Sequence, residues 1–231
     1  MITIPETNKD YICDIQAPCF QTLSPQEINF VSQSKTQVLF HKGDSLTKQG
    51  VFASYILFVM SGLAKQYIEN DNNKSFNLRI IRQGEFVGLS SVFAKNTYYY
   101  SSTALTECRT FLVEKAAIEK VIKQNGDFAF NIIRRYCELN TTLFNSLQNI
   151  IFKQMNGRLA DTLLYIDRLK NETQDIFRLL SRKDLAAFSG ISTENVVKLL
   201  KGLEKDNIII LKDKDIIITD KKRLEKISKT G

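Results

Sequence analysis

Short apolar segments separated by turn residues occupy residues 36–114 of this 231-residue chain. Segments such as YILFVMSG at 55–62 and RTFLVEK at 109–115 have the length of single strands. Turns rich in glycine, asparagine or aspartate separate the segments at intervals of about 8–12 residues. This spacing leaves no room for crossover helices and favours antiparallel pairing. We therefore predict that the first domain, residues 1–126, is an antiparallel, jelly-roll-like β-roll.

The hydrophobic period changes after Ala116, where apolar residues begin to recur every three or four positions. Asp127 can cap a helix that covers residues 127–152, and this helix carries a heptad-like apolar stripe. A stripe on so long a helix needs a partner surface, and a second copy of the chain is the simplest one. The other interpretation is packing on the β-roll alone. The predicted dimer interface consists of Ile132, Tyr136, Leu139, Leu143, Leu147 and Ile150.

The segment 184–204, DLAAFSGISTENVVKLLKGLE, has the spacing of two short helices that cross at a glycine turn. Ala186 is small enough to lie under the second helix, Gly190 can adopt a positive φ, and Val196 and Leu199 supply apolar contacts. An apolar hairpin, NIIILKDKDIIIT at 207–219, follows. The pattern predicts a winged helix-turn-helix, with an ordinary helical hairpin as the alternative. Residues 153–231 thus form a second domain, and the fold class is α+β.

Polar side chains follow the glycine turn, where they can meet base edges and phosphates. Others lie at the start of the preceding helix and at the tip of the wing. The predicted DNA-binding residues are Ser181, Arg182, Ser192, Thr193, Glu194, Asn195, Lys198, Lys201, Lys212 and Lys214.

The positive charge is concentrated in the second domain. Of the formal net charge of +7, residues 153–231 carry +5, with 17 Lys or Arg against 12 Asp or Glu. A basic excess beside a helix-turn-helix is expected where a protein binds a polyanion, although a solvated surface would look the same. No apolar run is long enough to span a membrane, and no secretory leader is recognisable. We expect a cytoplasmic protein with no membrane partner.

The order of these motifs resembles the Crp/Fnr family of bacterial transcription regulators. The resemblance covers about residues 20–220 and rests on segments such as KGDSLTKQG at 42–50, QGEFVGLSSVF at 83–93 and NGRLADTLLYI at 156–166. It implies a homodimer that binds a near-palindromic site in double-stranded DNA, an effector domain for a small molecule, and contact with RNA polymerase. It implies no catalytic residues. A metal enzyme on a cupin-like roll, the remote alternative, needs several histidines, and the chain has one.

The resemblance also places a candidate effector pocket at Gly88, Leu89 and Ser90 with Tyr100, Ser101 and Ser102. Family members that bind cyclic AMP carry a glutamate and an arginine where this chain has Leu89 and Tyr100. Without the guanidinium, a buried cyclic phosphate loses its charge-assisted partner. We therefore expect that cyclic AMP is not bound in the usual way. Arg79 is expected on the surface, because its strand alternates with the apolar residues Phe76, Leu78 and Ile80.

The cysteines and the single histidine leave a redox-, gas- or haem-responsive regulator of the same family as an alternative. Cys13, Cys19 and Cys108 give three thiolates, whereas an iron–sulfur cluster normally needs four. Cys137 is better explained as a small buried hydrophobe. His41 could ligate a haem, but one histidine cannot build a zinc site, and no metal site is predicted.

Overall fold

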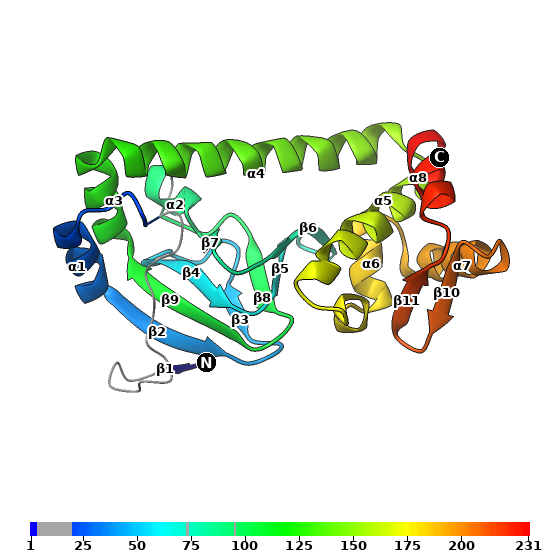
Figure 1. The fold of residues 1–231 in the computed structure, drawn as a ribbon, viewed down its shortest axis with the longest axis horizontal. Helices are drawn as coiled ribbons and strands as arrows, with labels where there is room; N and C mark the ends of the chain where they lie inside the picture. The colour runs from blue at the N-terminus through cyan, green and yellow to red at the C-terminus, as the bar shows by residue number, and fades with distance from the viewer. Residues whose placement is uncertain (4–19, 73, 95) are drawn as a thin grey trace. The chain divides into compact units, whose positions relative to one another are not determined.

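The computed structural model describes residues 1–3, 20–72, 74–94 and 96–231. They form two compact units. The roll unit comprises residues 1–74 and 79–140, and the C-terminal unit comprises residues 75–78 and 141–231. The predicted domain limits at 126 and 152 stay predictions. The α+β class is confirmed: a β-rich domain, a long helix, and a helix-turn-helix with a small hairpin follow one another (Figure 1).

Two antiparallel sheets build the roll (Figure 1). In the first sheet the strand order is β1 (Ile2–Thr3), β2 (Lys35–Phe40), β9 (Cys108–Glu114), β4 (Tyr55–Ser61) and β7 (Phe86–Val87). In the second it is β3 (Ser45–Thr47), β8 (Ser101–Ala104), β5 (Ala64–Glu69) and β6 (Ser75–Ile81). Most neighbours in the sheets are far apart in the chain, as the pairing of β2 with β9 illustrates, whereas β5 and β6 are consecutive. Such long-range antiparallel pairing is typical of jelly rolls.

Three helices accompany the strands of the roll: α1 (Pro25–Gln33), α2 (Ser90–Phe93) and α3 (Lys115–Gln124). A capping box starts α1, in which the Ser24 hydroxyl accepts from the Glu27 amide and the Glu27 carboxylate accepts from the Ser24 amide. The capping box thus satisfies two amide groups that the first turn of a helix otherwise leaves unpaired.

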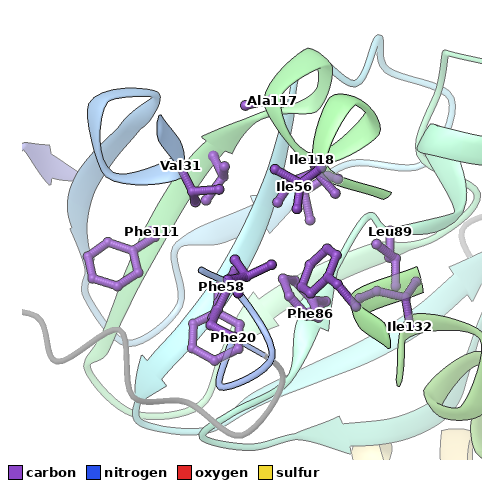
Figure 2. Close-up of a cluster of buried hydrophobic side chains, with 14 residues drawn as sticks. Phe20, Val31, Ile56, Phe58, Phe86, Leu89, Phe111, Ala117, Ile118 and Ile132 are labelled. Carbon is purple, nitrogen blue, oxygen red and sulfur yellow. The ribbon is translucent and has the colours of Figure 1, made fainter. Parts of the chain in front are cut away.

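A cluster of phenylalanines forms the centre of the larger core (Figure 2). Phe58 packs edge to face on Phe20 and Phe86, with ring centroids 5.2 Å and 5.0 Å apart. Phe128 and Ile132, from the first turns of α4 (Gly126–Phe152), are fully buried in the same cluster. The start of the long helix is therefore part of the roll's core.

The C-terminal unit consists mainly of helices. They are α5 (Met155–Arg168), the short 3-10 helices η2 (Leu169–Asn171) and η3 (Ile176–Leu179), α6 (Arg182–Ser189), α7 (Thr193–Lys205) and α8 (Lys221–Thr230). Strands β10 (Ile209–Lys212) and β11 (Asp215–Ile218) form the predicted hairpin, with Lys212 opposite Asp215 at its turn. Leu163 of α5, Phe177 of η3 and Val196 of α7 are fully buried, and α5 contacts both η3 and α7. In the described part of the chain, no helix combines the length and the apolarity needed to cross a membrane.

Candidate nucleic-acid interface

The turn between α6 and α7 has the geometry of a helix-turn-helix. Gly190 ends α6 in the left-handed conformation, with φ 62° and ψ 37°, and its amide donates to the Ala186 carbonyl. Val196 and Leu200 of α7 are buried, whereas Leu199, the other predicted contact, is only half-buried. A residue with a Cβ is strained in this conformation, which explains glycine at the turn. The crossing is therefore fixed by a local backbone requirement and by an apolar contact on one side of α7.

Two serines from the predicted site cap these helices. The Ser181 hydroxyl accepts from the Asp184 amide at 3.1 Å and donates to the Asp184 carboxylate at 2.6 Å. The Ser192 hydroxyl accepts from the Asn195 amide at 3.2 Å. Each hydroxyl therefore satisfies an amide of the first helical turn. A cap fixes where the helix starts, so both serines position the interface through the backbone.

Arg182 and Asn195 are more enclosed than their neighbours. Burial lowers the pKa of the Arg182 guanidinium below its ordinary value, and the residue is half-buried at the start of α6. The Asn195 side chain donates to the Met155 sulfur at 3.3 Å and so is directed toward α5. Of the residues predicted on α7, Asn195 is therefore the one that the structure directs away from the open face.

The open face of α7 carries both charge signs. Thr193, Glu194, Lys198 and Lys201 are exposed. Glu194, Lys198 and Lys201 recur at intervals of four and three residues, so their side chains lie on one side of the helix, and Thr193 precedes them at its first position. Val197 lies among them and is 39% exposed. Sequence reasoning missed this residue because a valine in an amphipathic helix is expected in the core. On the hairpin, Lys212 and Lys214 are exposed on either side of Asp213, which adopts a φ of 54°.

The predicted dimer stripe on α4 is only partly free. The prediction that Ile132 lies in the dimer interface is wrong, because its side chain is fully buried in the core of its own roll. Leu139 and Ile150 are half-buried, whereas Tyr136, Leu143 and Leu147 are exposed. Cys137, expected to be buried, is exposed as well. Further exposed apolar residues that the sequence analysis did not assign to the interface are Phe130, Ile133, Phe144, Ile151 and Phe152.

At the candidate effector site, Gly88 lies against two tyrosine side chains. The Gly88 amide donates to the Tyr100 hydroxyl at 2.8 Å. Gly88 has a φ of 84°, and a Cβ at this position would lie 2.5 Å from the Tyr98 ring. Burial raises the pKa of both tyrosines, that of Tyr98 to about 12. Gly88 and Tyr100, two of the predicted pocket residues, are therefore hydrogen-bonded to each other.

The other predicted pocket residues have different surroundings. Leu89 belongs to the phenylalanine-rich core. The Ser102 hydroxyl lies 2.6 Å from that of Thr47, and the Ser101 hydroxyl accepts from the Gln49 amide. The Ser90 hydroxyl oxygen is buried and has no partner among the described residues. Leu89, Ser101 and Ser102 are therefore each engaged by other residues of the roll.

The prediction that Arg79 lies on the surface is wrong. Arg79 is 8% exposed, its Nε donates to the Gln66 side chain at 2.8 Å, and its Nη1 forms an ion pair with Glu85. On β6, Asn77 and Arg79 are buried whereas Phe76 and Leu78 are half-buried, and only Ile80 of the three apolar residues expected inside is fully enclosed. A buried guanidinium is tolerated where a carboxylate and an amide oxygen accept hydrogen bonds from it.

The described residues include no cluster of three or more histidine, cysteine, aspartate or glutamate side chains that could hold a metal ion. Cys13 and Cys19 lie outside them. Cys108 is buried, its thiol donates to the Leu63 carbonyl, and burial raises the pKa of the thiol to about 11. His41 is exposed, and its Nδ1 is 3.9 Å from the Glu107 carboxylate.

Comparisons with known proteins agree with this architecture. Residues 37–125 match the model of the cyclic nucleotide-binding domain, and residues 157–227 match that of the Crp-like helix-turn-helix domain. A CRP-like cAMP-activated global transcriptional regulator of Mycobacterium tuberculosis is 24% identical over 213 residues, which cover 90% of this chain and 95% of the relative. The anaerobic regulatory protein of Bacillus subtilis is 24% identical over 219 residues, covering 88% and 91%.

Solved structures show the same fold. A transcriptional regulator of the crp/fnr family from Eubacterium rectale matches with a TM-score of 0.77 at 17% identity, covering 92% of this chain and 98% of that one. The c-di-GMP responsive global regulator of Xanthomonas campestris matches with a TM-score of 0.75 at 18% identity, covering 84% and 99%.

Proposed function

The chain belongs to the Crp/Fnr family of transcription regulators, and on that premise we propose that it binds a near-palindromic operator as a homodimer. As a member of this family it is a DNA-binding regulator and not an enzyme. The open face of α7 carries the proposal. Its exposed Thr193, Glu194, Lys198 and Lys201 offer donors and an acceptor for base edges and phosphates.

Different roles follow from the position of each side chain. Lys198 and Glu194 lie in the first half of α7, the part of a recognition helix that contacts bases. We infer that Glu194 accepts from a cytosine amino group and that Lys198 donates to a guanine. Lys212 and Lys214 at the hairpin turn, and Arg182 at the start of α6, serve as phosphate contacts.

The free apolar face of α4 supports the homodimer. Phe144, Leu147 and Ile151 are between 52% and 67% exposed and recur at intervals of three and four residues. Such spacing places them on one side of a helix, where a second helix with the same stripe covers them. An isologous contact of this kind brings two recognition helices to one operator, so the operator is expected to be a near palindrome.

We propose that the roll does not bind cyclic AMP in the usual way. Leu89 and Tyr100 offer no charge to a cyclic phosphate, and the Gly88 amide is already paired with the Tyr100 hydroxyl. The buried Arg79 is engaged by Glu85 and Gln66. A phosphate would have to replace the carboxylate as the partner of this guanidinium. Isothermal titration with cyclic AMP should give no heat of binding, and saturable micromolar binding would overturn this part of the proposal.

Substitution of Lys198 tests the DNA-binding proposal. Lys198→Ala should weaken binding to the selected operator by about 1–3 kcal/mol, roughly 5- to 150-fold, if the lysine contacts a base. Fluorescence anisotropy over a salt series distinguishes a base contact from a phosphate contact. Lys212→Ala, which removes a proposed phosphate contact, should lower the slope of log affinity against log salt concentration by about 1. Lys42→Ala, which removes an exposed lysine of the roll, is the matched control. Unchanged affinity after substitution of Lys198, Glu194 and Thr193 would remove the proposal.

We further propose that the bound dimer acts in the cytoplasm by contacting RNA polymerase. This rests on membership of a family of transcription regulators. Transcription in vitro from a promoter that carries the selected operator should change when the protein is added, in either direction. No change at saturating protein would count against the polymerase contact.

A further inference from the structure

An aliphatic side chain lies on the open face of the recognition helix α7. Val197 is 39% exposed, whereas Val196 and Leu200 are buried. With about 100° of rotation for each residue, Val197 lies about 60° from Glu194 and about 40° from Lys201 around the helix axis. Both of these residues are exposed. The buried Leu200 also lies about 60° from Val197, on its other side, so Val197 lies at the edge of the exposed face, next to Lys201.

We propose that Val197 contacts the C5-methyl group of a thymine in the major groove, once in each half-site. This inference rests on the proposed function. The thymine methyl is the one apolar group among the base-edge groups that the major groove displays. Val197 has no hydrogen-bonding group, and contact with a methyl removes apolar surface from water on both sides.

The length of the side chain favours a base over a phosphate. Val197 is the fifth residue of α7 and is short, so it reaches only what the helix itself approaches closely. Lys198 and Lys201 beside it are long enough to reach the backbone of the DNA and carry the charge to bind it. A cytosine at the same place would lack the methyl group. Val197 therefore gives a preference for thymine that Glu194 and Lys198 cannot give.

Deoxyuridine tests the contact directly, because it removes the thymine methyl and leaves every hydrogen-bonding group in place. The operator is first selected from random DNA with the wild-type chain, and each thymine of a half-site is then replaced in turn. At one of these positions, deoxyuridine in a single half-site should lower the affinity of the wild type about fourfold, which is the effect of one buried methyl group. Replacement in both half-sites should lower it by about 15-fold, as the product of two such effects.

Val197→Ala should bind with equal affinity to operators that carry thymine or deoxyuridine at that position. At every other thymine, replacement by deoxyuridine should change its affinity as it changes that of the wild type. Val51→Ala, the same substitution at an exposed valine of the roll, should keep the full discrimination. The melting temperature and the affinity for random DNA show that the variants are folded. A fourfold discrimination that persists in Val197→Ala, or a half-site without a methyl-sensitive thymine, would overturn the inference. Failure of the wild type to select any sequence would instead refute the proposed function, and the inference with it.

Discussion

Phe144→Ala should weaken the proposed homodimer, and the exposure of this side chain sets the size of the effect. Phe144 lies on the free face of α4 and is 65% exposed. A phenylalanine has about 200 Å² of surface to bury, so a second chain can cover about 130 Å² of this side chain. At about 25 cal/mol for each Å², that area corresponds to about 3 kcal/mol in each protomer. A two-fold interface contains Phe144 twice, so the upper limit of the loss in dimerisation free energy is twice this value.

Buried area converts only in part to affinity, because association also costs translational, rotational and side-chain freedom. The dissociation constant of the dimer should therefore rise by about 100- to 1,000-fold, which corresponds to about 3–4 kcal/mol. Sedimentation equilibrium over a dilution series measures this constant. The operator affinity of Phe144→Ala should fall at low protein concentration and recover at high concentration, because the DNA-binding face is intact.

Phe52→Ala is the matched control, since Phe52 is 64% exposed in the roll and lies outside α4. This variant should dimerise like the wild type. The same dissociation constant for both variants, or a wild type that stays monomeric over the whole series, would refute the assignment of the α4 face.

Three further predictions concern the stability of the fold. Glu85→Gln leaves the buried Arg79 without its anionic partner and should lower the free energy of unfolding in urea by about 2 kcal/mol; an unchanged midpoint would show that the pair adds no stability. Burial raises the pKa of Tyr98 from 10.0 to about 12, so the neutral phenol is favoured in the folded state, and the contribution of Tyr98 to stability should be constant below pH 10 and fall as the pH rises to 12. Tyr98→Phe should make that fall less steep, and identical profiles would contradict the assignment. Ser192→Ala should cost about 1 kcal/mol through loss of the α7 cap, whereas Ser192→Asn should retain most of it; equal losses in both variants would argue against the cap.

The helix-turn-helix could be predicted because its constraints are local. The turn needs a residue that tolerates the left-handed conformation, and Gly190 adopts it between Ala186 and Val196, as the spacing indicates. The hairpin that follows is local in the same sense, since its strands are adjacent in the sequence. Exposure of Lys198 and Lys201 follows from the helical period alone.

The buried side of α4 and that of β6 could not be predicted, because residues outside each element determine which side is covered. On α4, one apolar series runs through Ile132 and another through Ile133, and the periodicity does not reveal that the roll buries Ile132. On β6, the apolar residues alternate with Arg79, and its burial depends on Gln66 and Glu85 from elsewhere in the chain. Contacts made outside a helix or strand leave no pattern in the sequence of that element.

The symmetry of the selected operator tests the central claim most directly. In vitro selection with the full chain, followed by a measurement of the number of chains on each bound duplex, should yield an inverted repeat that binds two chains. The half-site centres should be about 10–10.5 base pairs apart, or a multiple of this distance. An asymmetric site occupied by one chain, or no enriched sequence at all, would contradict the account.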